Sequence, residues 1–189
     1  MDLHSWMADE MNDMRGRLQS SVLDLIPLER HKEQVDSGGS TITSLVWHIA
    51  RHQDIAINGV LLGEPLVHDS YVDRCNSGGL HPADGLAETE SQEITAVLDP
   101  AGVVAYYEAV CEHTSQHLSA GTFGDLDRLP DSGAALEAAG VNRDNVPWLF
   151  NMWEAKPASF HVRWEAISHG VTHTGEMVSM RNRMGLSPF

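Results

Sequence analysis

Six of the eleven histidines of this chain form pairs whose spacing suits metal binding. Three H-x-x-x-H pairs occur: His48/His52, His113/His117 and His169/His173. An α-helix turns about 100° per residue, so positions four apart differ by only about 40° around the helix axis. Both imidazoles of a pair can therefore reach one ion, and a facing helix has to supply a third ligand. Each pair is thus a candidate for part of a metal centre for zinc or a related ion, and the surroundings of each pair have to decide between them.

The pair in HGVTHTGE, residues 169–176, shares a helical stripe with two carboxylates. Glu165, His169, His173 and Glu176 lie on one face of a predicted helix, and apolar residues extend that face in both directions. Burying such a stripe is costly unless its polar groups are satisfied. A cation satisfies them, because two imidazoles bind it while a carboxylate orients an imidazole from behind. A hydrogen-bonded polar core or a partly solvated groove is the alternative that spacing leaves open.

The other two pairs have less uniform surroundings. His48 follows an apolar run and precedes Ile49, so its face points to the interior and favours it as a ligand. His52 has charged and polar neighbours, which predict a pocket or surface position. His113 and His117 stand in a polar stretch at the end of a predicted helix, where protonated histidines interact favourably with the helix dipole. We therefore expect this last pair to be an exposed helix end.

Several other kinds of catalytic site are excluded by their missing motifs. The sequence contains no H-E-x-x-H of metalloproteases, no glycine-rich nucleotide-phosphate loop and no G-x-S-x-G. No predicted helix carries E-x-x-H, which argues against a di-iron carboxylate bundle.

Long amphipathic stretches predict an all-α fold, a four-helix bundle with long irregular connections, in one domain over residues 1–189. The expected helices cover about 3–25, 41–62 and 158–184, with a third helical region from about 88 to 121. That region breaks at DPAG, where Asp99 as cap and Pro100 in the first turn restart the helix. EQVDSGGST, residues 33–41, predicts a turn. Residues 63–88 and 122–157 predict long connections, and connections of this length are often functional.

Composition limits the partners and the compartment. Twelve basic and 27 acidic residues give a net charge of −15, which disfavours nucleic acid and anionic membranes as partners. No secretory leader is visible and the two cysteines form no disulfide framework, so a cytoplasmic protein is expected. Three aromatic residues in six, Trp148, Phe150 and Trp153, predict either core packing, a substrate wall or a dimer contact.

Two segments resemble the DinB/YfiT superfamily of metal-binding four-helix bundles. SLVWHIARHQD carries a histidine at the position of the family's second-helix ligand. ISHGVTHTGEMVSMRNRMG matches the H-x-x-x-H-x-G-[EQ] pattern of the last helix and its basic tail. The matching positions are His48, His169, His173, Gly175 and Glu176.

The resemblance implies a divalent metal, zinc first and nickel or iron next, held by three histidines with open positions. His48, His169 and His173 are the expected ligands, and Glu176 is the expected catalytic residue that orients a ligand or shuttles a proton. Relatives include transferases that use mycothiol or bacillithiol and the mycothiol-dependent maleylpyruvate isomerase. A metal cation favours thiolate over thiol, so a low-molecular-weight thiol is the expected cosubstrate.

Three further residues are expected to border the substrate pocket: His52, Trp164 and Arg181. The function expected on this basis is a metal-dependent, mycothiol-type thiol S-transferase acting on a small electrophile. An isomerase of the maleylpyruvate type that returns its thiol unchanged is an alternative, and so is a non-enzymatic, stress-associated metal-binding bundle. A homodimer fits each of these. The arginine-rich, lysine-poor composition fits an actinobacterial source and hence mycothiol.

Overall fold

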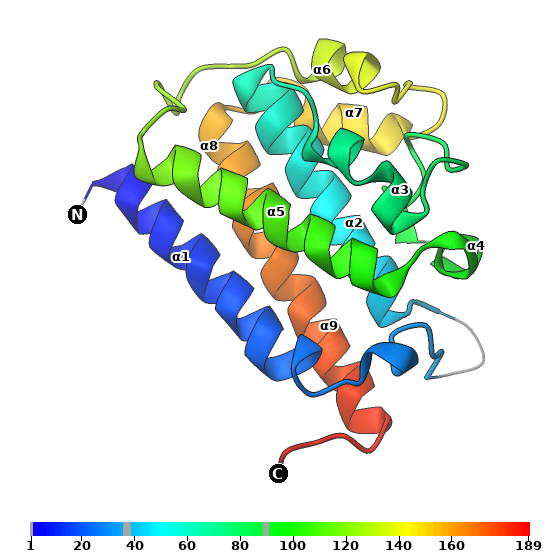
Figure 1. The fold of residues 1–189 in the computed structure, drawn as a ribbon. Helices are drawn as coiled ribbons and strands as arrows, with labels where there is room; N and C mark the ends of the chain where they lie inside the picture. Colours follow the sequence, from blue (N-terminus) through cyan, green and yellow to red (C-terminus); the bar gives the residue numbers. More distant parts are fainter. Residues whose placement is uncertain (1, 36–38, 89–90) are drawn as a thin grey trace.

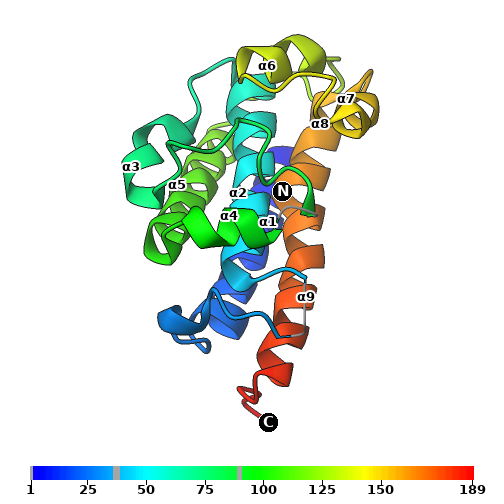
Figure 2. The same cartoon turned by 90° about the vertical axis from the view of Figure 1, so that its right-hand side faces the viewer.

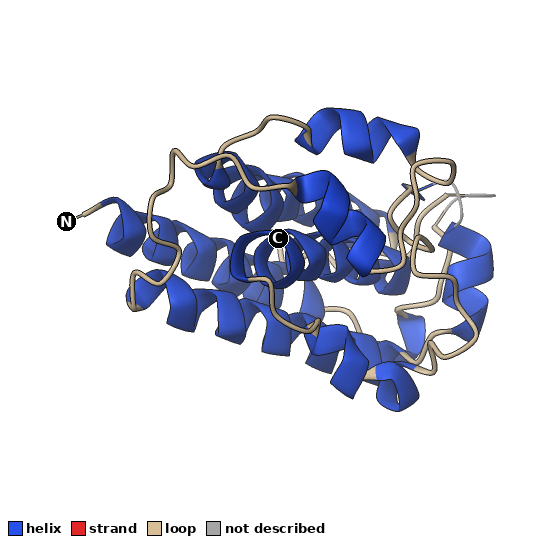
Figure 3. Ribbon diagram, turned by 90° about the horizontal axis from the view of Figure 1, so that it is seen from above, coloured by secondary structure: helices blue, strands red, loops and turns tan. Residues whose placement is uncertain are grey.

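Four long helices form the frame of the molecule. The computed structural model describes residues 2–35, 39–88 and 91–189, and these are built of helices and loops without a strand (Figure 3). The long helices are α1 (Leu3–Leu18), α2 (Ile42–Asp54), α5 (Pro100–Ser119) and α9 (His169–Arg183). Both α1 and α2 pack against α5 and against α9, which closes the bundle (Figure 1). The predicted all-α bundle is therefore confirmed.

Three of these helices continue as π-helix. The π-helical segments are Gln19–Leu23 after α1, Ile55–Leu62 after α2 and Val162–Ser168 before α9. The last of them joins α8 (Ala158–His161) to α9 in one continuous stack. Together with these extensions the helices cover nearly the ranges expected from sequence. π-helical turns occur preferentially at functional sites, and the third one leads directly into His169.

The helix starts follow from side-chain caps. The Asp99 side chain accepts a hydrogen bond from the Gly102 amide, and Pro100 stands in the first turn of α5. Thr41 and Ser44 form a reciprocal capping box at the start of α2. The predicted restart at DPAG is thus confirmed. Residues 36–38 of the predicted turn and residues 89–90 near the predicted third helix lie outside the described residues.

Short helices lie between the long ones, and several of them fall within the predicted connections 63–88 and 122–157. α3 (Val72–Cys75) and the 3-10 helices Leu28–Arg30 and Val67–Ser70 are single turns, whereas α4 (Ser91–Val97), α6 (Ser132–Ala138) and α7 (Pro147–Trp153) are longer. α4 crosses α2, and α6 caps one end of the bundle (Figure 2). The connection after α2 is therefore more ordered than its composition indicates.

A buried aspartate explains that order. The Asp54 carboxylate at the end of α2 is fully buried. It accepts hydrogen bonds from the backbone amides of Val67 and His68, from the Asn58 side chain and from the Tyr106 hydroxyl. A buried carboxylate requires such partners, so Asp54 fixes the path of the chain after α2.

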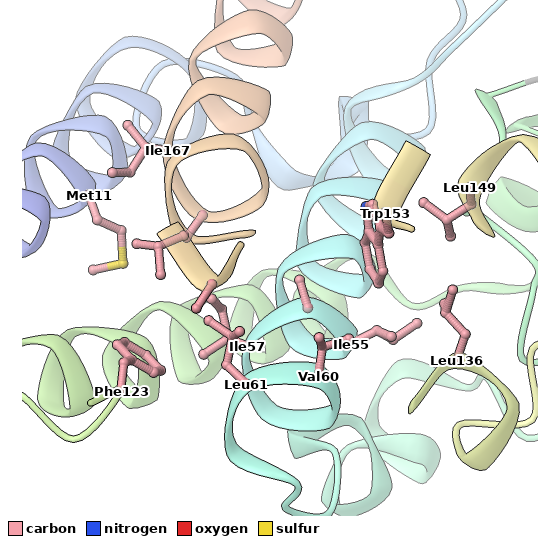
Figure 4. Close-up of a cluster of buried hydrophobic side chains, with 14 of the residues drawn as sticks. Met11, Ile55, Ile57, Val60, Leu61, Phe123, Leu136, Leu149, Trp153 and Ile167 are labelled. Carbon is pink, nitrogen blue, oxygen red and sulfur yellow. The ribbon is translucent and has the colours of Figure 1, made fainter. Parts of the chain in front are cut away.

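The core consists of two clusters. One joins α1, the π-helical segment after α2 and the helices α6 to α8, with Met11, Ile57, Leu136 and Trp153 among its members (Figure 4). The other lies between α2 and α5 and contains Trp47. No helix of the described residues is long and apolar enough to span a bilayer.

Candidate metal centre

Three imidazoles from two helices meet inside the bundle. His48 comes from α2, and His169 and His173 lie one turn apart on α9. His169 Nε2 is 3.0 Å from His48 Nε2 and 3.1 Å from His173 Nε2. All three residues are buried, with exposed fractions between 5% and 8%.

Hydrogen bonds at the far sides of two rings fix their tautomers. His48 Nδ1 lies 2.7 Å from the Gly85 carbonyl oxygen, to which it must donate because a carbonyl only accepts. His173 Nδ1 donates to the Glu176 carboxylate at 3.0 Å. The neutral rings of His48 and His173 therefore present unprotonated Nε2 atoms to the centre, which is the orientation expected of metal-binding histidines.

The remaining contacts cannot all be hydrogen bonds. His169 Nε2 can carry one proton, yet it faces lone pairs on both His48 and His173. At least one of the two short N···N contacts is therefore between bare nitrogens, and a cation resolves this conflict. Zinc–nitrogen bonds of about 2.0–2.1 Å place tetrahedral ligands about 3.3–3.4 Å apart, within a few tenths of an ångström of the observed spacing. The residues thus fit a divalent metal.

Burial keeps the imidazoles of His48 and His169 neutral. It lowers the pKa of His48 to about 2, and the neighbouring His52 ring acts in the same direction. Burial also lowers the pKa of His169 far below its usual value, again helped by the imidazoles around it. A metal ion binds the neutral ring, so both side chains are held in the ligating form at neutral pH.

A second group, His52, Glu165 and His169, is also close enough to hold an ion. However, His52 Nε2 lies 3.0 Å from the Leu86 carbonyl and Nδ1 lies 3.1 Å from Glu165. Trp153 Nε1 donates to the other oxygen of Glu165 at 2.5 Å. Because both ring nitrogens of His52 are occupied, we favour His48 over His52 as the ligand from α2.

The three-histidine centre opens onto a cavity of about 390 Å³. Trp164 stacks on His169 with ring centroids 6.3 Å apart, and Trp148 stacks on His52 at 6.1 Å. Trp148 is 43% exposed, so the cavity reaches the surface beside it. The lining residues are His48, His52, Leu86, Ala87, Glu88, Trp148, Met152, Trp164, His169, Thr172 and His173. An ion at the centre would therefore keep positions open toward an apolar chamber.

Comparison with known proteins agrees with this geometry. The family model of the DinB superfamily matches residues 11–175. The chain belongs to the DinB superfamily. A crystal structure of a conserved protein from Enterococcus faecalis superimposes with a TM-score of 0.71 at 15% sequence identity, covering 98% of this chain and 99% of that one. No curated protein matches the sequence. Family and geometry together support a metal-binding DinB-type protein.

The remaining expected site residues of this DinB protein do not all reach the cavity. Trp164 and His52 line the cavity, and His52 is 1% exposed, so its predicted surface alternative is wrong. Glu176 is half-buried and reaches the centre only through His173. The structure does not bring Arg181 to the cavity. Its Nη1 donates to the Ser21 carbonyl at 2.6 Å, so it fastens α9 to the π-helical segment after α1. At position 181 the face of α9 points toward the segment after α1 and not toward the cavity, and this direction was not evident from the sequence.

Several contributors to the site were not identified from sequence. The acceptors from Gly85 and Leu86 are backbone carbonyls, so no side-chain motif marks them. Glu88 stands at the edge of the cavity, with Oε1 3.9 Å from His173 Nε2. In the aromatic cluster, Trp153 packs in the core as one of the predictions had it, and Trp148 lines the cavity. The sequence feature that pointed to this part of the site was the unusual length of the 63–88 connection, since long connections are often functional.

Proposed function

We propose that this DinB protein is a metal-dependent thiol S-transferase that joins a mycothiol-type thiol to a small electrophile. One observation carries the proposal: three Nε2 atoms converge at the floor of an open cavity. Three protein ligands with a vacant position are typical of catalytic rather than structural zinc sites.

His48, His169 and His173 are the proposed ligands, and zinc is the proposed metal ahead of nickel and iron. A bound divalent cation supplies positive charge that favours thiolate over thiol at neutral pH. The Gly85 carbonyl and Glu176 hold the His48 and His173 rings with Nε2 directed inward. Pre-oriented ligands of this kind lower the reorganisation that binding requires.

The walls of the cavity suit a small, largely apolar electrophile. Trp148, Met152 and Trp164 supply apolar surface, and Thr172 and Glu88 supply polar groups. In the proposed reaction the thiol sulfur attacks an electrophilic carbon. The S–C bond forms while the leaving group departs with its bonding electron pair. Glu88, the acidic residue of the lining, takes the thiol proton to solvent.

The test is a panel of thiols with a generic electrophile. Zinc-replete protein is incubated with mycothiol, bacillithiol, glutathione or cysteine and a chlorinated nitroarene or bimane, and both conjugate and free thiol are measured. We expect one thiol consumed per conjugate formed. His48→Ala should lose both bound metal and activity, whereas His4→Ala, a change of the partly exposed histidine on α1, should keep both.

Other results would contradict the proposal. Isomerisation of maleylpyruvate with the thiol returned unchanged would assign the cavity to an isomerase. A metal-replete protein without activity toward any thiol would indicate a non-enzymatic metal-binding bundle. Full activity in metal-free protein would remove the three-histidine centre from the reaction.

A further inference from the structure

The third histidine pair, His113 and His117, acquires a partner from a distant part of the chain. Both residues lie on the C-terminal part of α5, and their ring centroids are 4.5 Å apart. Glu64 follows Gly63, which ends the π-helical segment after α2 in the left-handed conformation. The ligand atoms of Glu64, His113 and His117 all lie within 4.8 Å of one another. None of the three lines the cavity at the metal centre described above.

A threonine fixes the tautomer of His117. The Thr122 hydroxyl has one proton, which it donates to the His117 backbone carbonyl at 3.1 Å. His117 Nδ1 lies 2.7 Å from the same hydroxyl oxygen, so Nδ1 must be the donor in that contact. The neutral His117 ring is therefore left with an unprotonated Nε2. This is the same arrangement that the Gly85 carbonyl imposes on His48.

The His113 ring makes no hydrogen bond within the part of the chain that the structure describes. Its Nδ1 is buried and has no partner among the described residues. Its Nε2 lies 3.7 Å from a carboxylate oxygen of Glu64, which is too long for a hydrogen bond. Bonds of about 2.1 Å to one ion would bring tetrahedral ligands to about 3.4 Å. The three ligand atoms lie within 4.8 Å of one another, so closure around an ion requires approaches of at most about 1.4 Å. The Glu64 side chain is about half exposed, which leaves it free to move toward the imidazoles.

We propose that Glu64, His113 and His117 bind a second divalent cation. Two imidazoles and one carboxylate suit a borderline ion such as zinc or nickel. The last turn of a helix carries partial negative charge that attracts cations, and His117 lies in the last turn of α5. The net charge of −15 acts in the same direction at long range.

Such an ion joins the end of the second bundle helix to α5. Glu64 and His113 are separated by 49 positions in sequence, so a shared ion closes a long loop of chain. Binding to the folded state alone stabilises that state by mass action. The second ion is therefore a structural clamp, distinct from the proposed function at the three-histidine centre.

The test counts zinc ions on the whole, metal-free protein. Isothermal titration with Zn²⁺ should show two binding events in the wild type. His48→Ala should lose one of them and retain the other. His117→Ala should lose the event that His48→Ala retains, and Glu64→Gln should weaken that event at least about tenfold. Glu137→Gln removes one exposed negative charge from α6 and is the matched control, which should titrate like the wild type.

A conservative variant guards against misfolding. Thr122→Val removes the hydroxyl that orients His117 and should weaken the second event by about 10–100-fold, the usual cost of losing such an orienting group. One zinc per wild-type chain would overturn the proposal. So would a second event that Glu64→Gln, His117→Ala and Thr122→Val all leave unchanged.

Discussion

Gly85 links the stability of the fold to the orientation of a proposed ligand, and replacing it with alanine tests both. Its φ of +87° lies in the left-handed region, where a Cβ costs about 1–2 kcal/mol. The added Cβ would also stand 2.3 Å from two atoms of the Trp47 indole. Trp47 is buried in the core cluster between α2 and α5, so the ring has little room to move.

The backbone strain and the clash with Trp47 together give the expected loss of stability. Overpacking of this kind costs about 1–3 kcal/mol, so Gly85→Ala should lower the free energy of unfolding by about 2–5 kcal/mol in total. For a chain of this size that corresponds to a fall in Tm of about 4–20 °C. Displacement of the Gly85 carbonyl should also weaken zinc binding at the His48 centre by about 10–100-fold.

Denaturant unfolding and zinc titration measure these effects, with Gly79→Ala as control. Gly79 belongs to the same connection, has no positive φ, and a Cβ added to it would meet no atom within 4 Å. Its replacement should change the free energy of unfolding by less than about 0.5 kcal/mol. If Gly85→Ala proves as stable as Gly79→Ala, this loop does not pack closely against Trp47 and the reasoning is refuted.

Three further changes probe other parts of the molecule. Glu176→Ala should weaken zinc binding about 10–100-fold with little loss of stability, and Glu176→Gln should restore much of the affinity, both by titration. Gly102→Ala places a Cβ 1.9 Å from the Arg74 carbonyl oxygen and should lower the free energy of unfolding, measured in urea, by about 3 kcal/mol or more. As its control, Gly16→Ala on the exposed face of α1 should raise the free energy of unfolding by about 0.5–1 kcal/mol. Burial lowers the pKa of His161 to about 4 from 6.5, so below pH 6.5 the unfolded chain binds a proton that the native state does not. As the pH is lowered from 6.5 to 4, the free energy of unfolding should therefore decrease by about 1.4 kcal/mol per pH unit on account of this residue. His161→Leu should remove this contribution from the plot of unfolding free energy against pH, and an unchanged slope in that plot would contradict the argument.

The elements that sequence predicts well are those with local chemical causes. The restart at Asp99 and Pro100 depends on a cap and a fixed φ within one turn, and both are visible in four letters of sequence. The end of the second helix at Gly63 likewise follows from a residue that accepts the left-handed conformation. The order in the connection after it could not be predicted, because it depends on Asp54 meeting amides and a tyrosine from other elements.

The same distinction applies to the site. Four-residue spacing is local, and it correctly placed His169 and His173 on one face, where His48 joins them. The polar neighbours of His52 suggested exposure, yet tertiary packing buries that whole stretch of α2. For His113 and His117 the helix-end position was predicted, but the approach of Glu64 depends on how two distant segments pack.

In the loop over residues 81–88, the backbone and the side chains have different roles. Its main-chain oxygens at Gly85 and Leu86 hold two histidine rings, while its side chains at Ala87 and Glu88 face the chamber. Main-chain oxygens survive almost any substitution that preserves the path of the chain. Substitution of Ala87 would therefore change which molecules the chamber accepts while the two histidine rings keep their orientation. Ala87 is thus a natural starting point for redesigning selectivity, whereas Glu88 is reserved for the proposed proton transfer.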